Sequence, residues 1–257
     1  MPHPTFNPLS LEDRRILVTG ASSGIGRATA ILLSRLGATV ICNGRDPPRL
    51  DATLRQLEGV GHSIHPFDLR EIAGIPAWVE SIATSVGQLH GLVHAAGIQS
   101  VIPFHLASPQ KWQEVMLVNV ETALALSKAF QGRRVYAGEK GSIVYISSVM
   151  GQVGAPGRVL YSLSKGALEA MTRSLALELA PRKIRVNCVA PAFVRTAMLD
   201  EMAKLWTEEQ RAQVERLHPL GFGEVDDVAN AVAFLLADTG RWISGTVMRV
   251  DGCYTAQ

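Results

Sequence analysis

Short apolar, β-branched runs alternate along the chain with longer segments in which apolar residues recur at helical spacing. The short runs have the length and composition of buried strands, and the longer segments can cross back over a sheet. Helices are predicted over residues 26–37, 109–130 and 167–180. Strands are predicted at residues 15–19, 38–43, 62–67, 91–95, 142–147, 184–190 and 246–250.

This alternation predicts the fold class. Strands this apolar must be covered on both faces, which helices on both sides of a parallel sheet provide. Right-handed crossover connections then favour a doubly wound, Rossmann-type arrangement. We predict an α/β fold with one seven-stranded parallel sheet, forming a single domain over residues 1–257, in which residues 1–11 are a short N-terminal arm.

Residues 195–222 depart from the alternation, because this amphipathic helical segment follows a strand without returning directly to one. Ligands of doubly wound sheets bind beyond the carboxyl ends of the strands, and functional loops gather there. The segment is therefore a candidate substrate lid. A surface helix pair without function is the alternative.

The composition suits one soluble α/β domain, with 257 residues of which 47% are hydrophobic and 19% charged. A net charge of +2 gives no reason to expect nucleic acid or an anionic membrane as partner. The sequence has neither a long apolar span nor the apolar region of a signal peptide. Cys42, Cys188 and Cys253 lie in or beside predicted strands, so we expect buried free thiols and a cytoplasmic location.

A glycine-rich turn, TGASSGIG at residues 19–26, follows the first predicted strand and opens a helix. Gly20, Gly24 and Gly26 give the spacing GxxxGxG. Such a turn allows close backbone approach and presents the free N–H groups of a helix N-terminus to a pyrophosphate. A turn without ligand is the alternative, but its place after the first strand favours a dinucleotide site.

The end of the second predicted strand indicates which dinucleotide is bound. Gly44 stands where an NAD-binding site carries an acid on the ribose diol, and Arg45 follows it. A guanidinium binds a 2′-phosphate through charge-assisted hydrogen bonds, so NADP(H) is predicted in preference to NAD(H). A solvated arginine partly neutralised by Asp46 is the alternative.

The stretch YSLSK places Tyr161 and Lys165 four residues apart at the start of an Ala- and Leu-rich segment. On a helix these residues share a face, so the phenol and the ammonium lie one turn apart. The pair is either a solvated polar first turn or a phenol prepared to move a proton.

Taken together, the motifs along residues 12–256 resemble the short-chain dehydrogenase/reductase family, most of all its bacterial 3-oxoacyl-carrier-protein reductases. The resemblance is specific because the motifs occur in the family's order. They are TGASSGIG (19–26), FDL (67–69), HAAG (94–97), VNV (118–120), ISSVMG (146–151), YSLSK (161–165), VNCVAPAF (186–193) and SGTVMRVDG (244–252).

The resemblance implies a catalytic set. The family's serine stands 13 places before the tyrosine, and 161 − 13 = 148, which selects Ser148 over Ser147. In the expected reversible reduction of a ketone, Tyr161 protonates the carbonyl oxygen while Ser148 hydrogen-bonds to it. Lys165 is expected to lower the pKa of Tyr161 and to hold the nicotinamide ribose, and Asn119 to hold a water of a proton relay.

The resemblance also implies the cofactor contacts. Asp68 is expected at the adenine, and Val194 and Thr196 at the nicotinamide carboxamide. The whole predicted cofactor-binding set is Gly20, Ser22, Ser23, Gly24, Ile25, Gly26, Arg45, Asp68, Leu69, Ala95, Ala96, Gly97, Tyr161, Lys165, Val194 and Thr196.

Two positions depart from the family pattern. His94 replaces an asparagine that holds the central sheet, and we expect an interior histidine with satisfied hydrogen bonds in preference to a catalytic one. Ala192 replaces a glycine, and its extra methyl group is expected to shift the loop beside the nicotinamide slightly.

Substrate specificity is expected to lie in residues 98–108, 150–160 and 195–222, and the first two segments are mostly apolar. The predicted partner is a small-molecule or carrier-bound carbonyl compound. A sugar or polyol dehydrogenase and a catalytically silent NADP(H)-binding protein are the alternatives, and the resemblance implies a homo-oligomer, a tetramer or a dimer. Five basic residues form either a binding surface for an acidic carrier protein or a set of ordinary solvated charges. They are Arg133, Arg134, Lys140, Arg182 and Lys183.

Overall fold

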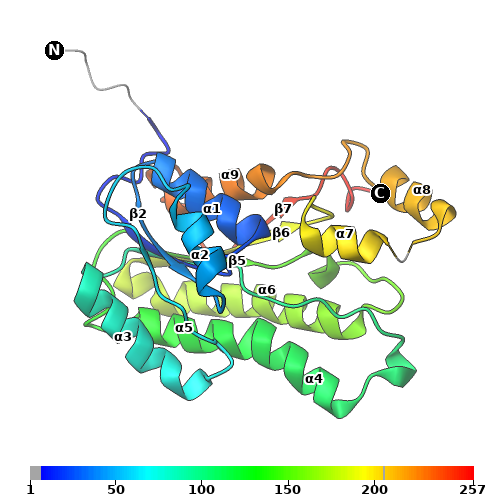
Figure 1. Cartoon of the computed structure of the whole chain (residues 1–257), viewed down its shortest axis with the longest axis horizontal. Helices are drawn as coiled ribbons and strands as arrows, with labels where there is room; N and C mark the ends of the chain where they lie inside the picture. Colours follow the sequence, from blue (N-terminus) through cyan, green and yellow to red (C-terminus); the bar gives the residue numbers. More distant parts are fainter. Residues whose placement is uncertain (1–6, 205) are drawn as a thin grey trace.

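The computed structural model describes residues 7–204 and 206–257, whose strands form one parallel sheet (Figure 1). The strand order is β3-β2-β1-β4-β5-β6-β7, which confirms the predicted seven-stranded sheet. The strands are β1 (Arg15–Thr19), β2 (Thr39–Asn43), β3 (Ser63–Ile64), β4 (Gly91–His94), β5 (Gly141–Ile146), β6 (Ile184–Pro191) and β7 (Val247–Val250).

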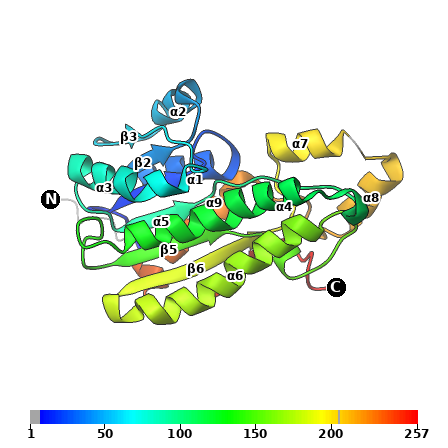
Figure 2. The ribbon, with the colours of Figure 1, turned by 90° about the horizontal axis from the view of Figure 1, so that it is seen from below.

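Helices cover both faces of the sheet (Figures 1 and 2). On one face α1 packs against α9, and on the other α3 packs against α5, which lies beside α6. The doubly wound arrangement is therefore confirmed. The helices are α1 (Gly24–Arg35), α2 (Pro47–Leu54), α3 (Ile75–Val86), α4 (Pro109–Met116), α5 (Thr122–Phe130), α6 (Val159–Leu179), α7 (Ala197–Ala203), α8 (Glu208–Arg216) and α9 (Val225–Leu236).

The central strands are buried on both faces because their successive side chains enter two different cores. In β1, Leu17 belongs to the core under α3, α5 and α6, whereas Ile16 and Val18 belong to the core under α1 and α9. In β5, Ile143 enters the first core and Val144 the second. This period of two explains why the strands are almost continuously apolar in sequence.

The switch point of the sheet lies between β1 and β4, because the chain fills the β2–β3 side first and then crosses to the β4–β7 side. Loops diverge at such a point and leave a crevice beyond the carboxyl ends of the strands. The glycine turn after β1 and the HAAG segment after β4 therefore border the same crevice.

Three predicted boundaries differ from the structure. The ladder of β3 is short, although His65 and Phe67 still donate their N–H groups to Cys42 and Gly44 of the β2 segment. Helix α6 begins at Val159, eight residues before the predicted start (167 − 159 = 8), so Tyr161 lies in its first turn. The predicted helix over 109–130 is α4 and α5 joined by a π-helical turn, η3 (Leu117–Glu121).

The 195–222 segment contains α7 and α8, as its amphipathic pattern predicts, while residue 205 lies outside the described residues. These helices project from one end of the molecule, beyond the end of β6 (Figure 2). The predicted N-terminal arm falls partly on residues 1–6, which are likewise not described. Its last residue is packed, since Leu11 is fully buried and donates its N–H to the Leu36 carbonyl, whereas Asn7 and Pro8 are exposed.

The cysteine prediction holds for two of the three thiols. Cys42 and Cys188 are free and buried in β2 and β6, where burial raises the pKa of each thiol to about 12. Cys253 is exposed, so the expectation of burial is wrong there; it lies past the end of β7 with φ of 73°. In the described part of the chain, no helix is long and apolar enough to cross a membrane.

His94 ties together β1, β4 and α5. Its Nδ1 lies 2.9 Å from Thr19 Oγ1 and its Nε2 lies 3.2 Å from Thr122 Oγ1. The side chain is buried, and burial followed by the charge of Lys165 lowers its pKa from 6.5 to about 3. The imidazole is therefore neutral near neutral pH, and the interpretation as a satisfied interior histidine is confirmed.

The depressed pKa of His94 predicts a pH dependence of stability. Between about 6.5 and about 3 the unfolded chain binds a proton that the folded protein does not, so stability falls as the pH decreases. From about pH 7.5 to about pH 5, we expect the wild-type protein to lose about 2 kcal/mol more unfolding free energy than His94→Asn. Urea titrations at both pH values measure this difference.

The control is His105→Asn, which replaces an exposed histidine and should retain the pH dependence of the wild type. Equal losses in the wild type and in His94→Asn would contradict the burial of a neutral imidazole at this position.

Candidate active site

Two adjoining cavities open at the carboxyl ends of the central strands. The first, of about 140 Å³, is bordered by Ser148, Tyr161 and Lys165. The second, of about 450 Å³, is bordered by the glycine turn, Arg45 and Asp68. The cavities are continuous because they share the lining residues Ile25, Ala95, Gly97, Ile98, Thr196 and Met198.

The glycine turn brings three backbone segments into close contact. A Cβ atom at Gly20 would lie 2.8 Å from the Ala96 nitrogen, and Gly20 has φ of 69°. A Cβ atom at Gly26 would lie 2.3 Å from the Gly20 carbonyl oxygen. Because a side chain at either position would collide with backbone, these glycines let β1, the start of α1 and the end of β4 meet.

The first turn of α1 is suited to bind an anion. Ser23 is the N-cap residue, but its side chain makes no capping hydrogen bond, and the first turn contains no acidic residue. The first N–H groups of a helix have no acceptor within the helix, and the helix dipole is positive at this end. The residues present therefore fit a pyrophosphate at the turn.

Arg45 lines one end of the second cavity. It is exposed, and in the described part of the chain no carboxylate lies within 4 Å of its guanidinium. The Asp46 carboxylate accepts a hydrogen bond from the Arg49 N–H and caps α2. Asp46 therefore has a structural role of its own, which weakens the alternative that it neutralises Arg45.

Asp68 lies at the same end of the cavity, where it is paired with an arginine that the sequence analysis did not select. Arg70 Nε lies 3.0 Å from Asp68 Oδ1 and 2.9 Å from Oδ2. The hydrogen bond from Arg70 is the main cause of a lowered pKa of Asp68. The carboxylate is therefore ionised near neutral pH. Arg70 lines the same end of the second cavity as Asp68.

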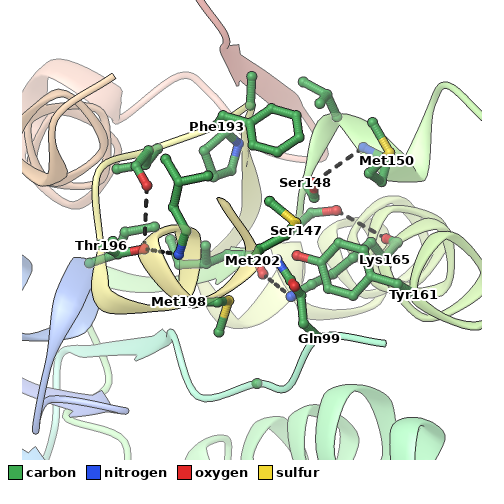
Figure 3. A pocket seen from close by; sticks show the side chains of 18 of the residues that line it. Gln99, Ser147, Ser148, Met150, Tyr161, Lys165, Phe193, Thr196, Met198 and Met202 are labelled. Carbon is green, nitrogen blue, oxygen red and sulfur yellow. Dashed lines mark hydrogen bonds between the residues drawn. The ribbon is translucent and has the colours of Figure 1, made fainter. Parts of the chain in front are cut away.

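The two adjacent serines have different environments (Figure 3). Ser147 Oγ lies 3.1 Å from both the Lys165 carbonyl oxygen and Glu169 Oε1, so its hydroxyl is engaged by α6. Ser148 Oγ accepts a hydrogen bond from the Met150 N–H, and Ser148 acts to lower the pKa of Tyr161, beside which it lines the first cavity. This difference supports the choice of Ser148 as the serine that faces a substrate.

Tyr161 and Lys165 lie together on the first turns of α6. The Lys165 ammonium lies 5.6 Å from the centroid of the Tyr161 ring and donates a 2.8 Å hydrogen bond to the Ile146 carbonyl. Burial lowers the pKa of Lys165 from 10.5 to about 8. The ammonium is held at the wall of the cavity by the end of β5.

Burial also raises the pKa of the Tyr161 phenol, while the Ser148 hydrogen bond and the charge of Arg158 act against this rise. The direction is opposite to the lowering that we expect from Lys165. The reason is that removing the phenolate from water costs more than Ser148 and the charge of Arg158 restore. The phenol consequently stays protonated near neutral pH.

Asn119 lies in η3, behind the cavity wall. Its Oδ1 accepts from the Ile98 N–H, and its Nδ2 donates to the Ile98 carbonyl and to Ser164 Oγ. Both amide N–H bonds are used, so the side chain can offer a water only the second lone pair of Oδ1. Gly97 fits between the two groups, since a Cβ atom there would lie 3.2 Å from Asn119 Oδ1 and 3.6 Å from Lys165 Nζ.

The loop after β6 reaches the glycine turn. Thr196 caps α7 by accepting the Leu199 N–H, and its Cγ2 would lie 3.5 Å from a Cβ atom at Gly24. Thr196 therefore borders the junction of the two cavities, and Val194 lines the first cavity. Ala192 keeps a negative φ and donates its N–H to the Val250 carbonyl, so its methyl group is accommodated without backbone strain.

All predicted site residues except Asn119 line one of the two cavities, and their roles stay predictions. Sequence reasoning missed Arg70 and Arg158. Arg70 could have been found because it stands two residues after Asp68. Arg158 could have been found because it stands three residues before Tyr161, a spacing at which Arg158 and Tyr161 share a helix face. The spacing of Arg158 and Tyr161 is informative only once α6 is known to begin at Val159.

Comparisons with known proteins agree with this geometry. A family model described as "Enoyl-(Acyl carrier protein) reductase" matches residues 20–255. The chain is 34% identical over 247 residues to a 3-oxoacyl-(acyl-carrier-protein) reductase of Thermotoga maritima, covering 95% of this chain and 98% of that protein.

Solved structures with the same fold include a short-chain type dehydrogenase/reductase from Mycobacterium ulcerans. Its TM-score is 0.89 at 30% identity, covering 96% of this chain and 92% of that chain. A gluconate 5-dehydrogenase from Burkholderia cenocepacia, in complex with NADP and tartrate, has a TM-score of 0.90 at 28% identity. That comparison covers 97% of this chain and 98% of that one.

Proposed function

The chain belongs to the short-chain dehydrogenase/reductase family, and from this premise we propose that it is an NADP(H)-dependent oxidoreductase that interconverts a ketone and a secondary alcohol. The observation that carries the proposal is the convergence of Ser148, Tyr161 and Lys165 on a cavity continuous with the glycine turn. Proton transfer and hydride transfer require these two regions to adjoin.

The proposed cofactor would extend along the second cavity, and its nicotinamide end would reach the first cavity. The first turn of α1 would bind the pyrophosphate, Arg45 the 2′-phosphate, and Asp68 with Leu69 the adenine. Lys165 would hold the nicotinamide ribose, and Val194 and Thr196 the carboxamide. When bound, the reduced nicotinamide supplies the hydride for the carbonyl carbon.

Tyr161 acts as the general acid in this proposal. Its burial keeps the phenol protonated, and it can therefore deliver a proton to the carbonyl oxygen at neutral pH. Ser148 donates a hydrogen bond to the same oxygen and stabilises its developing charge. Lys165, whose pKa is lowered to about 8, lies one helical turn from Tyr161. It replaces the proton that Tyr161 gives up, through the relay water expected at Asn119.

Two substrate classes follow from the relatives. The name of the Thermotoga maritima relative indicates a 3-oxoacyl group on a carrier protein, and that of the Burkholderia cenocepacia neighbour indicates a sugar acid. We propose that the substrate is a carbonyl compound of one of these two classes. Which class it is depends on the charges that face the first cavity.

The basic residues considered for carrier binding lie far from that cavity. Arg133, Arg134 and Lys140 precede the amino end of β5, and Arg182 and Lys183 precede that of β6. Ser148 follows the carboxyl end of β5, a six-residue strand that spans roughly 20 Å. These basic residues are therefore at the opposite edge of the sheet from the chemistry, which favours the interpretation as ordinary surface charges.

We also propose a homo-oligomer. Helices α4 and α5 follow each other end to end on one face, with α6 beside them (Figure 2), and the three carry partly exposed apolar side chains. Their exposed fractions are 42% for Trp112, 48% for Leu124, 56% for Leu163 and 80% for Leu177. An apolar face of this kind is typical of an interface with a second copy.

The proton donor is tested by Tyr161→Phe. We expect kcat for NADPH-dependent ketone reduction to fall by at least ~100-fold, because the general acid is lost. NADPH affinity, measured by fluorescence titration, should stay within about threefold. Tyr136→Phe is the control, since Tyr136 bonds to Lys183 at the far edge of the sheet.

Substantial turnover by Tyr161→Phe would disprove the proton-donor role. If the wild-type protein binds NADPH tightly but reduces no ketone or acyl thioester in a broad panel, the catalytically silent alternative is correct.

The cofactor preference is tested by Arg45→Ala. Loss of a charge-assisted hydrogen bond to the 2′-phosphate should weaken NADPH binding ~10- to 100-fold and NADH binding by less than about threefold. Arg55→Ala, which removes an exposed arginine just beyond α2 and outside the cavity, is the control. Equal losses for the two cofactors would rule out 2′-phosphate recognition by Arg45.

The oligomer is tested by light scattering coupled to gel filtration. The wild-type protein should have two or four times the mass of one chain, and Leu124→Glu/Leu177→Glu should shift it toward one chain by placing charges in the interface. Val60→Glu, at a residue 89% exposed between α2 and β3, should leave the mass unchanged. A monomeric wild-type protein would contradict the proposal.

A further inference from the structure

Arg158 immediately precedes α6, whose first turn carries Tyr161. It is the N-cap residue of the helix and stands three residues before Tyr161. Its half-buried side chain lines the first cavity together with Ser148, Tyr161 and Met202. The guanidinium is therefore placed where a substrate held by Ser148 and Tyr161 would extend.

This guanidinium lacks an anionic partner. Within residues 7–204 and 206–257, its one hydrogen bond is a 2.7 Å approach of Nη2 to Met202 Sδ, and a thioether is a weak acceptor. Within the described residues, no carboxylate lies within 4 Å of it, and the titratable groups that face it are the hydroxyls of Tyr161 and Tyr254. Burial lowers the pKa of Arg158, which shows that its charge is held at a cost.

Other arginines of low exposure in this protein are well satisfied. Arg14 donates to the Leu236 carbonyl and pairs with Asp238. Arg185 donates to three carbonyl oxygens at the end of α9 and beyond it. The absence of such partners at Arg158 is therefore specific to the cavity and is not a general property of the chain's interior.

The first cavity as a whole favours an anion. Of its described lining residues only Arg158 and Lys165 carry charge, and none is acidic. The Lys165 ammonium is already bound to the Ile146 carbonyl, so Arg158 is the cation that remains available. The positive end of the α6 dipole adds to the field at this point. A bound carboxylate would offset the desolvation of the guanidinium through a bidentate pair.

We propose that Arg158 binds a carboxylate group of the substrate, and that the protein acts on small oxo acids and the corresponding hydroxy acids. This inference rests on the proposed ketone reduction and names its substrate class. A carrier-bound 3-oxoacyl group is disfavoured, because its carboxyl carbon is part of a neutral thioester. The first cavity measures only about 140 Å³, and the nicotinamide would share it, so a short acid is favoured over a long one.

The carboxylate takes no part in the bond changes. Reduction adds a hydride to the carbonyl carbon and a proton from Tyr161 to its oxygen, which gives the hydroxy acid and oxidised cofactor. Arg158 is thus a specificity-determining residue that orients the carbonyl toward Ser148 and Tyr161. The apolar side chains of Leu199 and Met202 would contact the carbon chain.

The test compares acids with their neutral esters. The probes are 2-oxobutanoate, 3-oxobutanoate and 4-oxopentanoate, each beside its methyl ester, assayed by NADPH consumption. For the wild-type protein we expect kcat/KM for at least one acid to exceed that for its ester by about tenfold or more. Arg158→Gln should lower kcat/KM for that acid ~10- to 100-fold and change that for the ester by less than about threefold.

Two further variants separate charge recognition from structural damage. Arg158→Lys keeps the charge and should retain more of the acid preference than Arg158→Gln. Arg173→Gln makes the same charge change on an exposed position of the same helix and should leave both substrates unaffected. In thermal-shift assays of the complex with oxidised cofactor, which cannot reduce the oxo acid, the preferred acid should stabilise the wild type and Arg158→Lys but not Arg158→Gln.

The outcomes distinguish this inference from the proposed function. If the wild-type protein reduces esters as well as acids, or Arg158→Gln lowers both equally, the carboxylate role of Arg158 is wrong while ketone reduction stands. If no ketone, acid or ester is reduced, the proposed function fails and the inference fails with it.

Discussion

The close approach of backbone at the carboxyl ends of β1 and β4 is the constraint on which the rest of the site depends. Gly20 and Gly26 allow the turn after β1, the start of α1 and the Ala96 segment to meet without intervening side chains. This contact fixes the crevice at the switch point of the sheet. It also brings the open N–H groups of α1 and the segment that carries Gly97 to the same cavity, so that the residues predicted for cofactor binding and for proton transfer adjoin.

Burial sets the electrostatics of the site more than pairing does. It holds His94 neutral inside the sheet, lowers the pKa of Lys165 and raises that of Tyr161. A protonated phenol beside a lysine that releases its proton readily is suited to the reductive direction, in which a proton must be delivered to oxygen. The π-helical turn of Asn119 supports this arrangement from behind by holding Ile98 and Ser164.

The described lining of the first cavity contains basic but no acidic side chains, which the fold does not require. Its walls are mostly apolar, yet among the described residues Arg158 has no carboxylate partner there and lies in contact with Met202 of α7. An anionic substrate would therefore join the start of α6 to the helix that begins the 195–222 segment. Substrate binding and the packing of that segment would then be coupled through one guanidinium, which is consistent with a lid role.

Particular residues show what could be deduced from the sequence. The apolar runs determined the parallel sheet, because each side chain of a buried strand must enter one of two cores, as Leu17 and Val18 do. The glycine spacing and the YSLSK stretch located the site, because backbone freedom and the four-residue helical spacing are local properties. The family motifs likewise placed Ser148 and Tyr161 on one cavity, where the structure has them.

Other properties were decided only by the tertiary structure. The direction of the Tyr161 pKa shift, the exposure of Cys253 and the remote position of Arg133 and Lys140 could not be read from neighbours in sequence. Nor could the lack of a partner at Arg158. The physical reason is that desolvation and charge pairing depend on which distant segments surround a group. The sequence encodes each side chain's chemistry and local period, whereas folding determines how much water and which counter-charges remain around it.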